Sequence, residues 1–557
     1  MSAVRWGLAL ALFVTTLAVL VSTARELGYS RDEGFYFHAA SVYEKWFDDV
    51  GVNRARALER TRVDETFSVN HEHPALMKGL FALSHRELHV RHAVFSEPGT
   101  SYRFPGMVVS ALLVTAVFLW ASARRGVAVG LASAGVLFLA PRFFYHAHLA
   151  CFDAPIAALF FFTCMAYARS LETEGPLWPV LTGVLFGLAL DTKHNSWFLP
   201  FVVVAHAALL GLTTLRTRRG LVATLRRPLQ VLAAMGLVGP MVCYALWPWI
   251  WHDTVARLRE YARFHLEHEY YNMEFLGSNY FEPPMPRLYA PIMTLATVPM
   301  ATLLAAGVGV LFALRSLVRD LRARDREVVE THGDAALWAI AVLVSYAPWL
   351  RDSTPIFGGT KHWMTAYPFL ALFAGEGIHQ VSIRLKTELE LRGLARAAAS
   401  LRAVVAGLVL APSLEQAWDA HPWGLSAYSP VVGGASGAAS LGLNRGFWGY
   451  TTGALVDYLN RTVPEDGAVY PHDTGLVAWE TLKEDGRLRR DIRAVWSIDA
   501  ADIVLYHHEM HMQGQEYQAW VVCGTTRPDV VRGLDGVPVV WAYRCSKNVR
   551  TANREAR

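Results

Sequence analysis

The chain has 557 residues, of which 53% are hydrophobic and 18% are charged, and its mean hydropathy is +0.24. Average soluble domains carry about 25% charged residues, so this composition excludes an ordinary soluble enzyme. The net charge of +4 is small, and the arginines cluster in short segments between apolar blocks, which argues against a nucleic-acid-binding protein.

The apolar residues gather in blocks of about 15–25 residues, the length that a membrane-spanning helix needs. The first block resembles a signal peptide, but it is long and no clear cleavage pattern follows it, so we expect an uncleaved helix. We predict a mainly α, polytopic membrane protein with about eleven spans. The expected spans are 6–24, 105–122, 127–141, 150–168, 177–191, 196–214, 229–248, 288–314, 336–350, 363–379 and 399–414.

The positive residues of the connections predict the orientation. The even-numbered connections contain Arg124 and Arg125, then Arg169, and later arginine clusters around 216–227, 315–326 and 384–402. Short loops rich in Lys and Arg face the cytoplasm. The odd-numbered connections, including 25–104 and 249–287, are therefore expected on the outer face.

The tail differs in composition from the rest of the chain. Glycines concentrate in 432–446, and helical and strand-like segments then alternate up to about Tyr543. We predict a membrane domain over 1–414 and a small extracytoplasmic α/β domain over 415–557. Cys523 and Cys545 could pair in an oxidising compartment.

Polar residues of unusual type occur in the connections that we expect on the outer face. Asp32 and Glu33 are adjacent carboxylates that closely follow the first span. Charges beside the hydrocarbon region are costly and tend to mark a functional site. The other candidates are Tyr36, His71, His73, Arg103, His146, His148, Asp153, Lys193, His194, Lys361 and His362. We predict one site on this face, with the loop 25–104 as its catalytic part.

These residue types suit a reaction between a polar acceptor and a phosphate on a lipid. A carboxylate can take a proton from an acceptor hydroxyl or amine. Arg and Lys can bind the phosphate and stabilise its charge as it leaves.

Simpler interpretations exist for several of these residues. Asp153 could begin a helix as an N-terminal acid, and Arg103 and Lys193 could extend to lipid headgroups. His146 and His148, with Asp32 and Asp153, could hold a divalent ion, although solvated or hydrogen-bonded histidines are more common.

Several short motifs occur in an order that resembles C-type glycosyltransferases. Arg31-Asp32-Glu33 resembles the acidic first-loop motif of that family. The later motifs are Arg103-Phe-Pro-Gly, Phe152-Asp153-Ala154-Pro155, Thr192-Lys193-His194-Asn195, Trp247-Pro-Trp-Ile-Trp and Gly358-Gly359-Thr360-Lys361-His362. Over roughly residues 1–380, the ordered set looks like family 39, which contains protein O-mannosyltransferases and lipid A aminoarabinose transferases.

The resemblance implies an inverting glycosyltransferase that moves a hexosyl or pentosyl group and requires no cofactor. Carried over by position, Asp32 would be the general base, Glu33 its neighbour and Asp153 a further catalytic acid. Contacts to the donor phosphate or sugar would come from Arg103, Lys193, His194, Lys361 and His362. His71, His73 and Tyr36 would lie on the acceptor side. The segment Gly358–Lys361 departs from the more usual Asp-Gly-Glu-Arg.

The expected partners are a polyprenyl-phosphate-linked sugar, membrane lipids, and a protein, glycolipid or polysaccharide acceptor. The expected location is a bacterial inner membrane, with the site and the tail facing out. The main alternative is a multi-pass transporter or flippase. Transporters often show internal repeats and polar residues at the membrane midplane, and we find neither pattern here. A binding or scaffold protein acting through its tail is a third interpretation.

Overall fold

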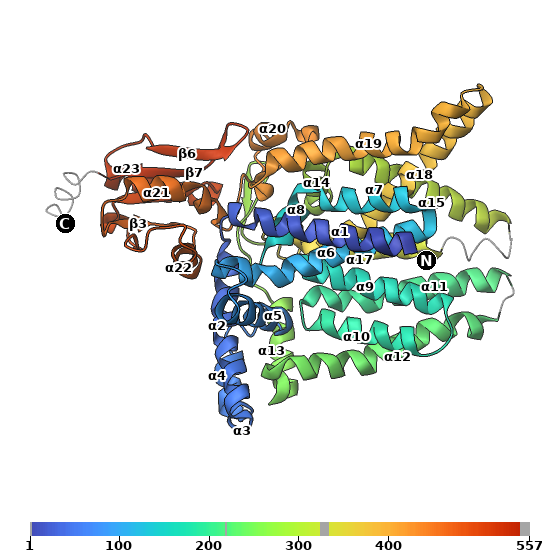
Figure 1. Cartoon of the computed structure of the whole chain (residues 1–557), viewed down its shortest axis with the longest axis horizontal. Coiled ribbons are helices and arrows are strands. Elements are labelled where there is room, and N and C mark those ends of the chain that lie inside the picture. The colour runs from blue at the N-terminus through green and yellow to red at the C-terminus, as the bar shows by residue number, and fades with distance from the viewer. Residues whose placement is uncertain (1–2, 218–219, 324–332, 546–557) are drawn as a thin grey trace.

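A computed structural model of the chain describes residues 3–217, 220–323 and 333–545. A bundle of long helices forms one part, and a smaller region of strands and short helices lies at one end of it (Figure 1). We call this end the site end and the opposite end of the bundle the arginine end.

Eleven long or medium helices make up the bundle. They are α1 Ala3–Thr23, α6 Pro98–Arg125, α7 Val127–Phe138, α9 Asp153–Glu172, α10 Leu177–Leu190, α11 Leu199–Thr217, α12 Leu221–Leu246, α15 Met300–Ala323, α17 Gly333–Tyr346, α18 Tyr367–Leu391 and α19 Ala395–Ala420. Each of the predicted apolar segments coincides with one of them, except that 288–314 is divided between α14 Tyr289–Thr297 and α15.

The predicted count of eleven spans is not confirmed. Six helices in the described chain are long and apolar enough to cross a membrane, or up to seven if the bent pair formed by α7 and α8 Pro141–His148 is one span. Part of the difference has a geometric cause. Helix α10 has 14 residues, so it rises about 21 Å and falls short of the roughly 30 Å hydrocarbon core.

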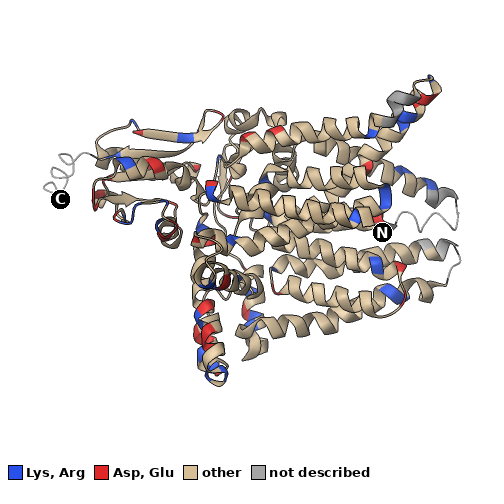
Figure 2. Ribbon diagram, viewed as in Figure 1, with Lys and Arg blue, Asp and Glu red and all other residues tan. Residues whose placement is uncertain are grey.

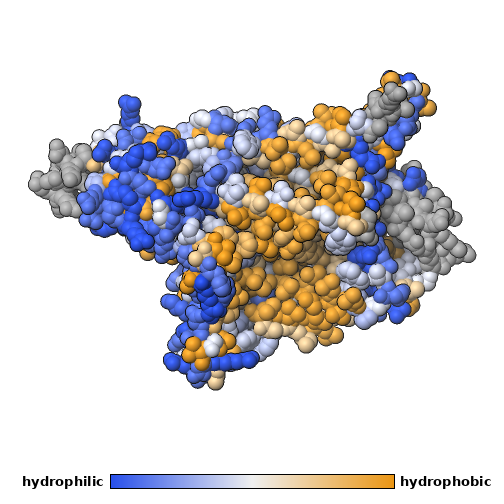
Figure 3. Space-filling model, viewed as in Figure 1, coloured by the Kyte–Doolittle hydropathy of each residue, from blue (hydrophilic) through white to orange (hydrophobic). Residues whose placement is uncertain are grey.

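The surface of the bundle is apolar between its two ends. Hydrophobic side chains cover the bundle face seen in Figure 3, whereas the site-end elements are largely hydrophilic. Exposed side chains on this surface include Phe201, Leu237, Met241, Leu304 and Leu408. Contiguous apolar surface of this kind is rare on soluble monomers. The chain is therefore a multi-pass membrane protein.

The segment 25–104, predicted as a loop, is largely helical and lies across the site end (Figure 1). It contains α2 Arg31–Val52, α3 Arg54–Ala57, α4 Arg60–Phe67 and α5 Leu76–Ser84. Helix α2 begins with a capping box, in which Ser30 and Glu33 each accept a hydrogen bond from the other's backbone. The site end also carries α13 Thr254–Leu266 and the hairpin of β1 Met273–Phe275 and β2 Ser278–Tyr280.

The tail contains a five-stranded sheet in the order β4-β3-β5-β7-β6, so its predicted α/β character is confirmed. Its elements are α20 Gly434–Ser440, α21 Val456–Thr462, β3 Ala468–Tyr470, α22 Leu476–Glu484, β4 Arg493–Ala494, β5 Ile503–His507, α23 Gln513–Cys523, β6 Val530–Leu534 and β7 Val537–Arg544. Strand β3 runs parallel to β4 and β5, and β7 runs antiparallel to β5 and β6. Cys523 and Cys545 form a disulfide.

The tail packs directly against the N-terminal segment. One hydrophobic cluster contains Tyr36 and Phe37 of α2 together with Trp479 and Leu482 of α22. Gly34 allows this close approach, because a Cβ at this position would lie 3.2 Å from the backbone nitrogen of Ala478. The tail is therefore placed beside the acidic first turn of α2.

Candidate active site

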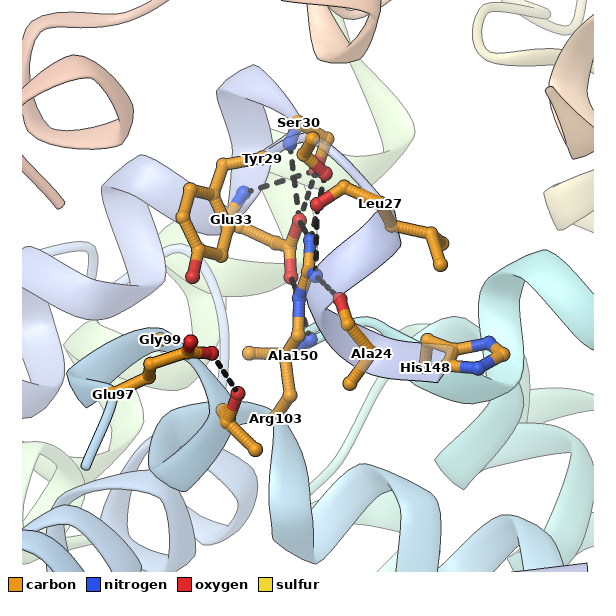
Figure 4. Close-up of polar contacts among 12 residues, drawn as sticks. Ala24, Leu27, Tyr29, Ser30, Glu33, Glu97, Gly99, Arg103, His148 and Ala150 are labelled. Atoms are coloured by element: carbon orange, nitrogen blue, oxygen red, sulfur yellow. Dashed lines mark hydrogen bonds and ion pairs between the residues drawn. The ribbon is translucent and has the colours of Figure 1, made fainter. Parts of the chain in front are cut away.

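Glu33 and Arg103 form a fully buried ion pair at the start of α2 (Figure 4). Arg103 Nε and Nη2 donate to the two Glu33 oxygens at 2.7 and 2.8 Å. The Glu33 carboxylate also accepts from Ser30 N and from Ala150 N. Arg103 further donates to carbonyl oxygens of the turn before α2, those of Ala24 and Gly28. This arrangement favours a structural role for both residues over contact with a substrate.

Asp32 points the other way and stays partly exposed. Its side chain is 21% exposed, and its Oδ2 lies 3.4 Å from Lys361 Nζ. The Lys361 ammonium lies over the Trp448 ring, 4.1 Å from the centroid. Gly358, at φ +72°, makes this turn possible, because a Cβ there would lie 2.4 Å from Lys361 Cε. The two adjacent carboxylates of the predicted motif are thus separated into a buried one and an accessible one.

Asp153 and Lys193 form a second buried pair. Lys193 Nζ donates to Asp153 Oδ1 at 2.5 Å, and His146 Nδ1 lies 3.5 Å from Asp153 Oδ2. Asp153 begins α9, and Lys193 follows α10. The Asp153 carboxylate also interacts electrostatically with Lys361, the partner of Asp32.

Tyr36 connects the two carboxylates. Its ring contacts Phe152 at a centroid distance of 4.2 Å, next to Asp153 in the chain, and it lies one helical turn from Asp32. Burial and the charges of Asp32 and Asp153 raise the Tyr36 pKa, so this phenol stays protonated at neutral pH. Asp32, Tyr36, Asp153, Lys193 and Lys361 therefore lie in one neighbourhood at the site end.

Arg142, in α8, belongs to the same neighbourhood and was not singled out from the sequence. Its side chain is 2% exposed, and its Nε and Nη2 have no hydrogen-bond partner. It lies over the Tyr428 ring, and a Cβ at Gly359 would be 3.6 Å from its Nη1. Within the described chain Arg142 makes no ion pair, and an uncompensated buried charge is strongly destabilising. In the sequence, Arg142 stands out only by its position between Pro141 and an aromatic segment.

The predicted histidines divide into separate groups. His71 lies 3.0 Å from Glu260 Oε1, and His73 packs on Tyr36 and Phe152. The ring of His194 lies 4.2 Å from that of His265. His362 packs on Trp349, 4.5 Å between centroids, and its Nε2 contacts the Phe357 carbonyl. Within the described residues, none of these four histidines forms a hydrogen bond or an ion pair with Asp32.

The segment with His71 and His73 is held by Lys78 of α5. Its ammonium is fully buried and donates to the carbonyl oxygens of Asn70 and His73 at 2.5 and 2.8 Å. Burial lowers the pKa of Lys78 to about 7. Lys78 therefore fixes the turn before α5.

The tail adds acidic residues next to the start of α2. Arg31 Nη1 donates to Asp473 Oδ1 at 2.7 Å. Glu509 lies close by, and burial together with the charge of Asp473 raises the pKa of Glu509 to about 8. No local sequence pattern indicates this contact, because Arg31 and Asp473 are 442 residues apart.

A divalent ion is a poor fit to the predicted set. His148 Nε2 lies 2.8 Å from Thr23 Oγ1, and its Nδ1 lies 2.8 Å from the Phe144 carbonyl oxygen, so this ring faces α1. Asp32 and Asp153 each have an ammonium partner, which already balances their charge. Among the described residues, no group of three or more His, Cys, Asp or Glu side chains could hold a metal ion.

Residues 88–248 match the family model described as dolichyl-phosphate-mannose-protein mannosyltransferase. The predicted resemblance to C-type membrane glycosyltransferases is confirmed. The matched segment contains Arg103, Arg142, His146, Asp153 and Lys193, but it ends before Lys361 and begins after Asp32. No protein with a curated description matches the chain.

Three solved structures align with most of this chain. ArnT from Cupriavidus metallidurans in the apo state is 14% identical, with 97% of this chain and 98% of that chain covered and a TM-score of 0.47. The same protein bound to undecaprenyl phosphate is 16% identical, with 98% and 99% covered and a TM-score of 0.46. The oligosaccharyltransferase AglB from Archaeoglobus fulgidus, in complex with an inhibitory peptide and a dolichol-phosphate, is 10% identical, with 94% and 71% covered and a TM-score of 0.47.

Proposed function

We propose that the chain transfers a sugar from a polyprenyl-phosphate-linked donor to an acceptor at the outer membrane face, with inversion at the anomeric carbon. One observation carries the proposal. An accessible carboxylate, Asp32, lies beside the Lys361 ammonium and in the neighbourhood of the unpaired Arg142, at one end of a membrane bundle. A base next to cations suits proton removal from an acceptor and departure of a phosphate.

The reaction is a single displacement. The acceptor hydroxyl or amine attacks the anomeric carbon while the Asp32 carboxylate takes its proton. The bond between this carbon and the phosphate oxygen breaks, and polyprenyl phosphate leaves with the bonding electrons. Lys361 and Arg142 stabilise the charge that develops on the leaving phosphate.

Asp153 and Lys193 have a supporting role in this proposal. Asp153 is buried and paired with Lys193 through Oδ1, while His146 Nδ1 lies 3.5 Å from its Oδ2. The pair holds the start of α9 beside the turn that follows α10, and it adds a second ammonium near the sugar or phosphate. Glu33 and Arg103 hold the turn from which Asp32 projects.

The outward orientation is part of the same proposal. Arginines gather at the end of the bundle opposite Asp32, where loops facing the cytoplasm carry positive charge (Figure 2). The disulfide of the tail suits an oxidising compartment, and the tail lies at the site end. A bacterial inner membrane fits both features.

The test uses purified full-length protein in nanodiscs with polyprenyl-phosphate mannose labelled in the sugar. Membranes from cells that lack this protein supply the acceptor. We expect label to leave the lipid fraction with wild-type protein and to remain there with Asp32→Asn. In proteoliposomes, a flippase would move the labelled lipid across the bilayer without cleaving it, and that result would contradict the proposal.

A further inference from the structure

A large cavity lies at the arginine end of the bundle, far from Asp32. Its volume is about 1120 Å³, and the helices around it include α6, α9, α12, α15 and α18. Helix α6 measures the separation, because Arg103 lies near its start and Arg125, which lines the cavity, ends it. The 22 residue steps from Arg103 to Arg125 rise about 33 Å at 1.5 Å per residue. The cavity is therefore not part of the active site.

Several arginines close the wall of this cavity through ion pairs. Arg125 of α6 donates to both oxygens of Glu376 of α18, at 2.6 and 3.1 Å. Arg124 pairs with Asp334 at 2.5 Å and also with Glu172. These pairs join helices, and they neutralise the nearby carboxylates of Glu376, Asp334 and Glu172.

Arg315 of α15 and Arg384 of α18 also line the cavity, but their environment differs. Both guanidinium groups lie over the ring of Phe312, at 5.9 and 4.2 Å from its centroid. Within the described chain neither forms an ion pair. The two side chains are exposed at the cavity, so the mouth has positive charge that no carboxylate of the described residues balances.

The wall of the cavity is also partly apolar. Leu171, Leu210, Ala313, Leu337 and Trp338 line it together with the arginines. A cavity with an apolar wall and a basic mouth, between helices of a membrane bundle, suits a ligand with a phosphate head and an apolar body. Arg binds phosphate through two parallel N–H···O bonds, which a Lys cannot reproduce.

We propose that this cavity binds a phosphate group through Arg315 and Arg384. The phosphate can belong to a membrane phospholipid or to a small phosphate in solution, and the chemistry of recognition is the same. This site is independent of sugar transfer, so its test needs no substrate of the enzyme.

The test is native mass spectrometry of the detergent-purified full-length protein. The probes are dioleoylphosphatidylglycerol, dioleoylglycerol with the same chains and no phosphate, and inorganic phosphate. We expect wild-type protein to bind a phosphate-bearing probe and not dioleoylglycerol. Arg315→Gln with Arg384→Gln should weaken that binding about tenfold or more, because two charge-assisted contacts are lost.

Arg226→Gln is the matched control. Arg226 is an exposed arginine of α12 that does not line the cavity, although its neighbour Arg227 does. Melting temperatures without probe should be equal for wild type, the double variant and the control. Displacement of the lipid by inorganic phosphate would identify a solution phosphate as the ligand, and its absence would identify the lipid. Equal loss in Arg226→Gln, no loss in the double variant, or equal binding of dioleoylglycerol would overturn the proposal.

Discussion

Lys361 Nζ lies 3.4 Å from Asp32 Oδ2, although the two residues are 329 positions apart in the chain. Asp32 comes from the first turn of α2, and Lys361 comes from the glycine turn that precedes α18. The contact places a cation beside the proposed base. A donor phosphate would bind the Lys361 ammonium in place of Asp32, which would leave the Asp32 carboxylate free to accept a proton.

Replacing Lys361 should weaken donor binding. Lys361→Met removes a charge-assisted contact to the phosphate, so we expect KM for the polyprenyl-phosphate sugar to rise about 10- to 100-fold. Lys361→Arg keeps the charge and should recover part of the loss. Steady-state kinetics on the purified variants measures this. If KM is unchanged in Lys361→Met, the Lys361 ammonium pairs with Asp32 and does not bind the donor phosphate.

Arg142 is expected to act on the same phosphate. Its guanidinium is buried without an ion pair, so Arg142→Gln should raise KM or lower kcat by at least about tenfold. The variant should also be at least as stable as wild type, because it removes an uncompensated buried charge. Kinetics and melting temperature together separate the roles. A variant with normal kinetics and a lower melting temperature would show that Arg142 only supports the packing.

Arg103 should behave as a structural residue. Arg103→Met leaves the Glu33 carboxylate buried and unpaired, which costs about 3–5 kcal/mol. We expect a lower melting temperature and less folded protein in membranes. Combining Arg103→Met with Glu33→Gln should recover part of the stability, because no unpaired charge remains. If Arg103→Met instead melts like wild type and only raises KM, Arg103 contacts the donor.

Glu509 predicts a dependence of stability on pH. Its pKa is about 8 in the folded protein, compared with the ordinary 4.5, so the folded state holds a proton that the unfolded chain has released. Stability contributed by this proton is present up to pH 4.5 and is lost as pH rises towards 8.

Glu509→Gln should remove this pH dependence. At about pH 9, its melting temperature should exceed that of wild type by a few degrees, whereas the two should agree near pH 5. Thermal denaturation at both pH values gives the comparison. If the melting temperatures of wild type and Glu509→Gln instead change in parallel between pH 5 and pH 9, Glu509 is ionised in the folded state.

Much of the fold could be predicted because its signals are local. Apolar runs located every bundle helix, and alternating patterns located most elements of the tail. Strand β6 has a weaker signal, because it is a partly exposed edge strand without a continuous apolar run. The helices of 25–104 were missed. Their stability comes from packing on α6 and on the tail rather than from a strong periodicity of their own.

The site could be predicted only in part because its contacts are long-range. The motifs named Asp32, Glu33 and Arg103, but nothing local indicates that Arg103 uses its guanidinium on Glu33. Ser30 and Glu33 do form a capping-box pattern, and this pattern could have assigned Glu33 to the helix start. Arg142 becomes a candidate only when the structure shows that a buried arginine has no ion-pair partner among the described residues.

The most direct test of the account is the turnover of Asp32→Asn. The substitution keeps the size of the side chain and removes its ability to accept a proton. In purified protein, kcat for sugar transfer should fall about 10²- to 10⁴-fold, while binding of polyprenyl phosphate and the melting temperature stay close to wild type. A kcat within a few-fold of wild type would contradict the assignment of Asp32 as the base.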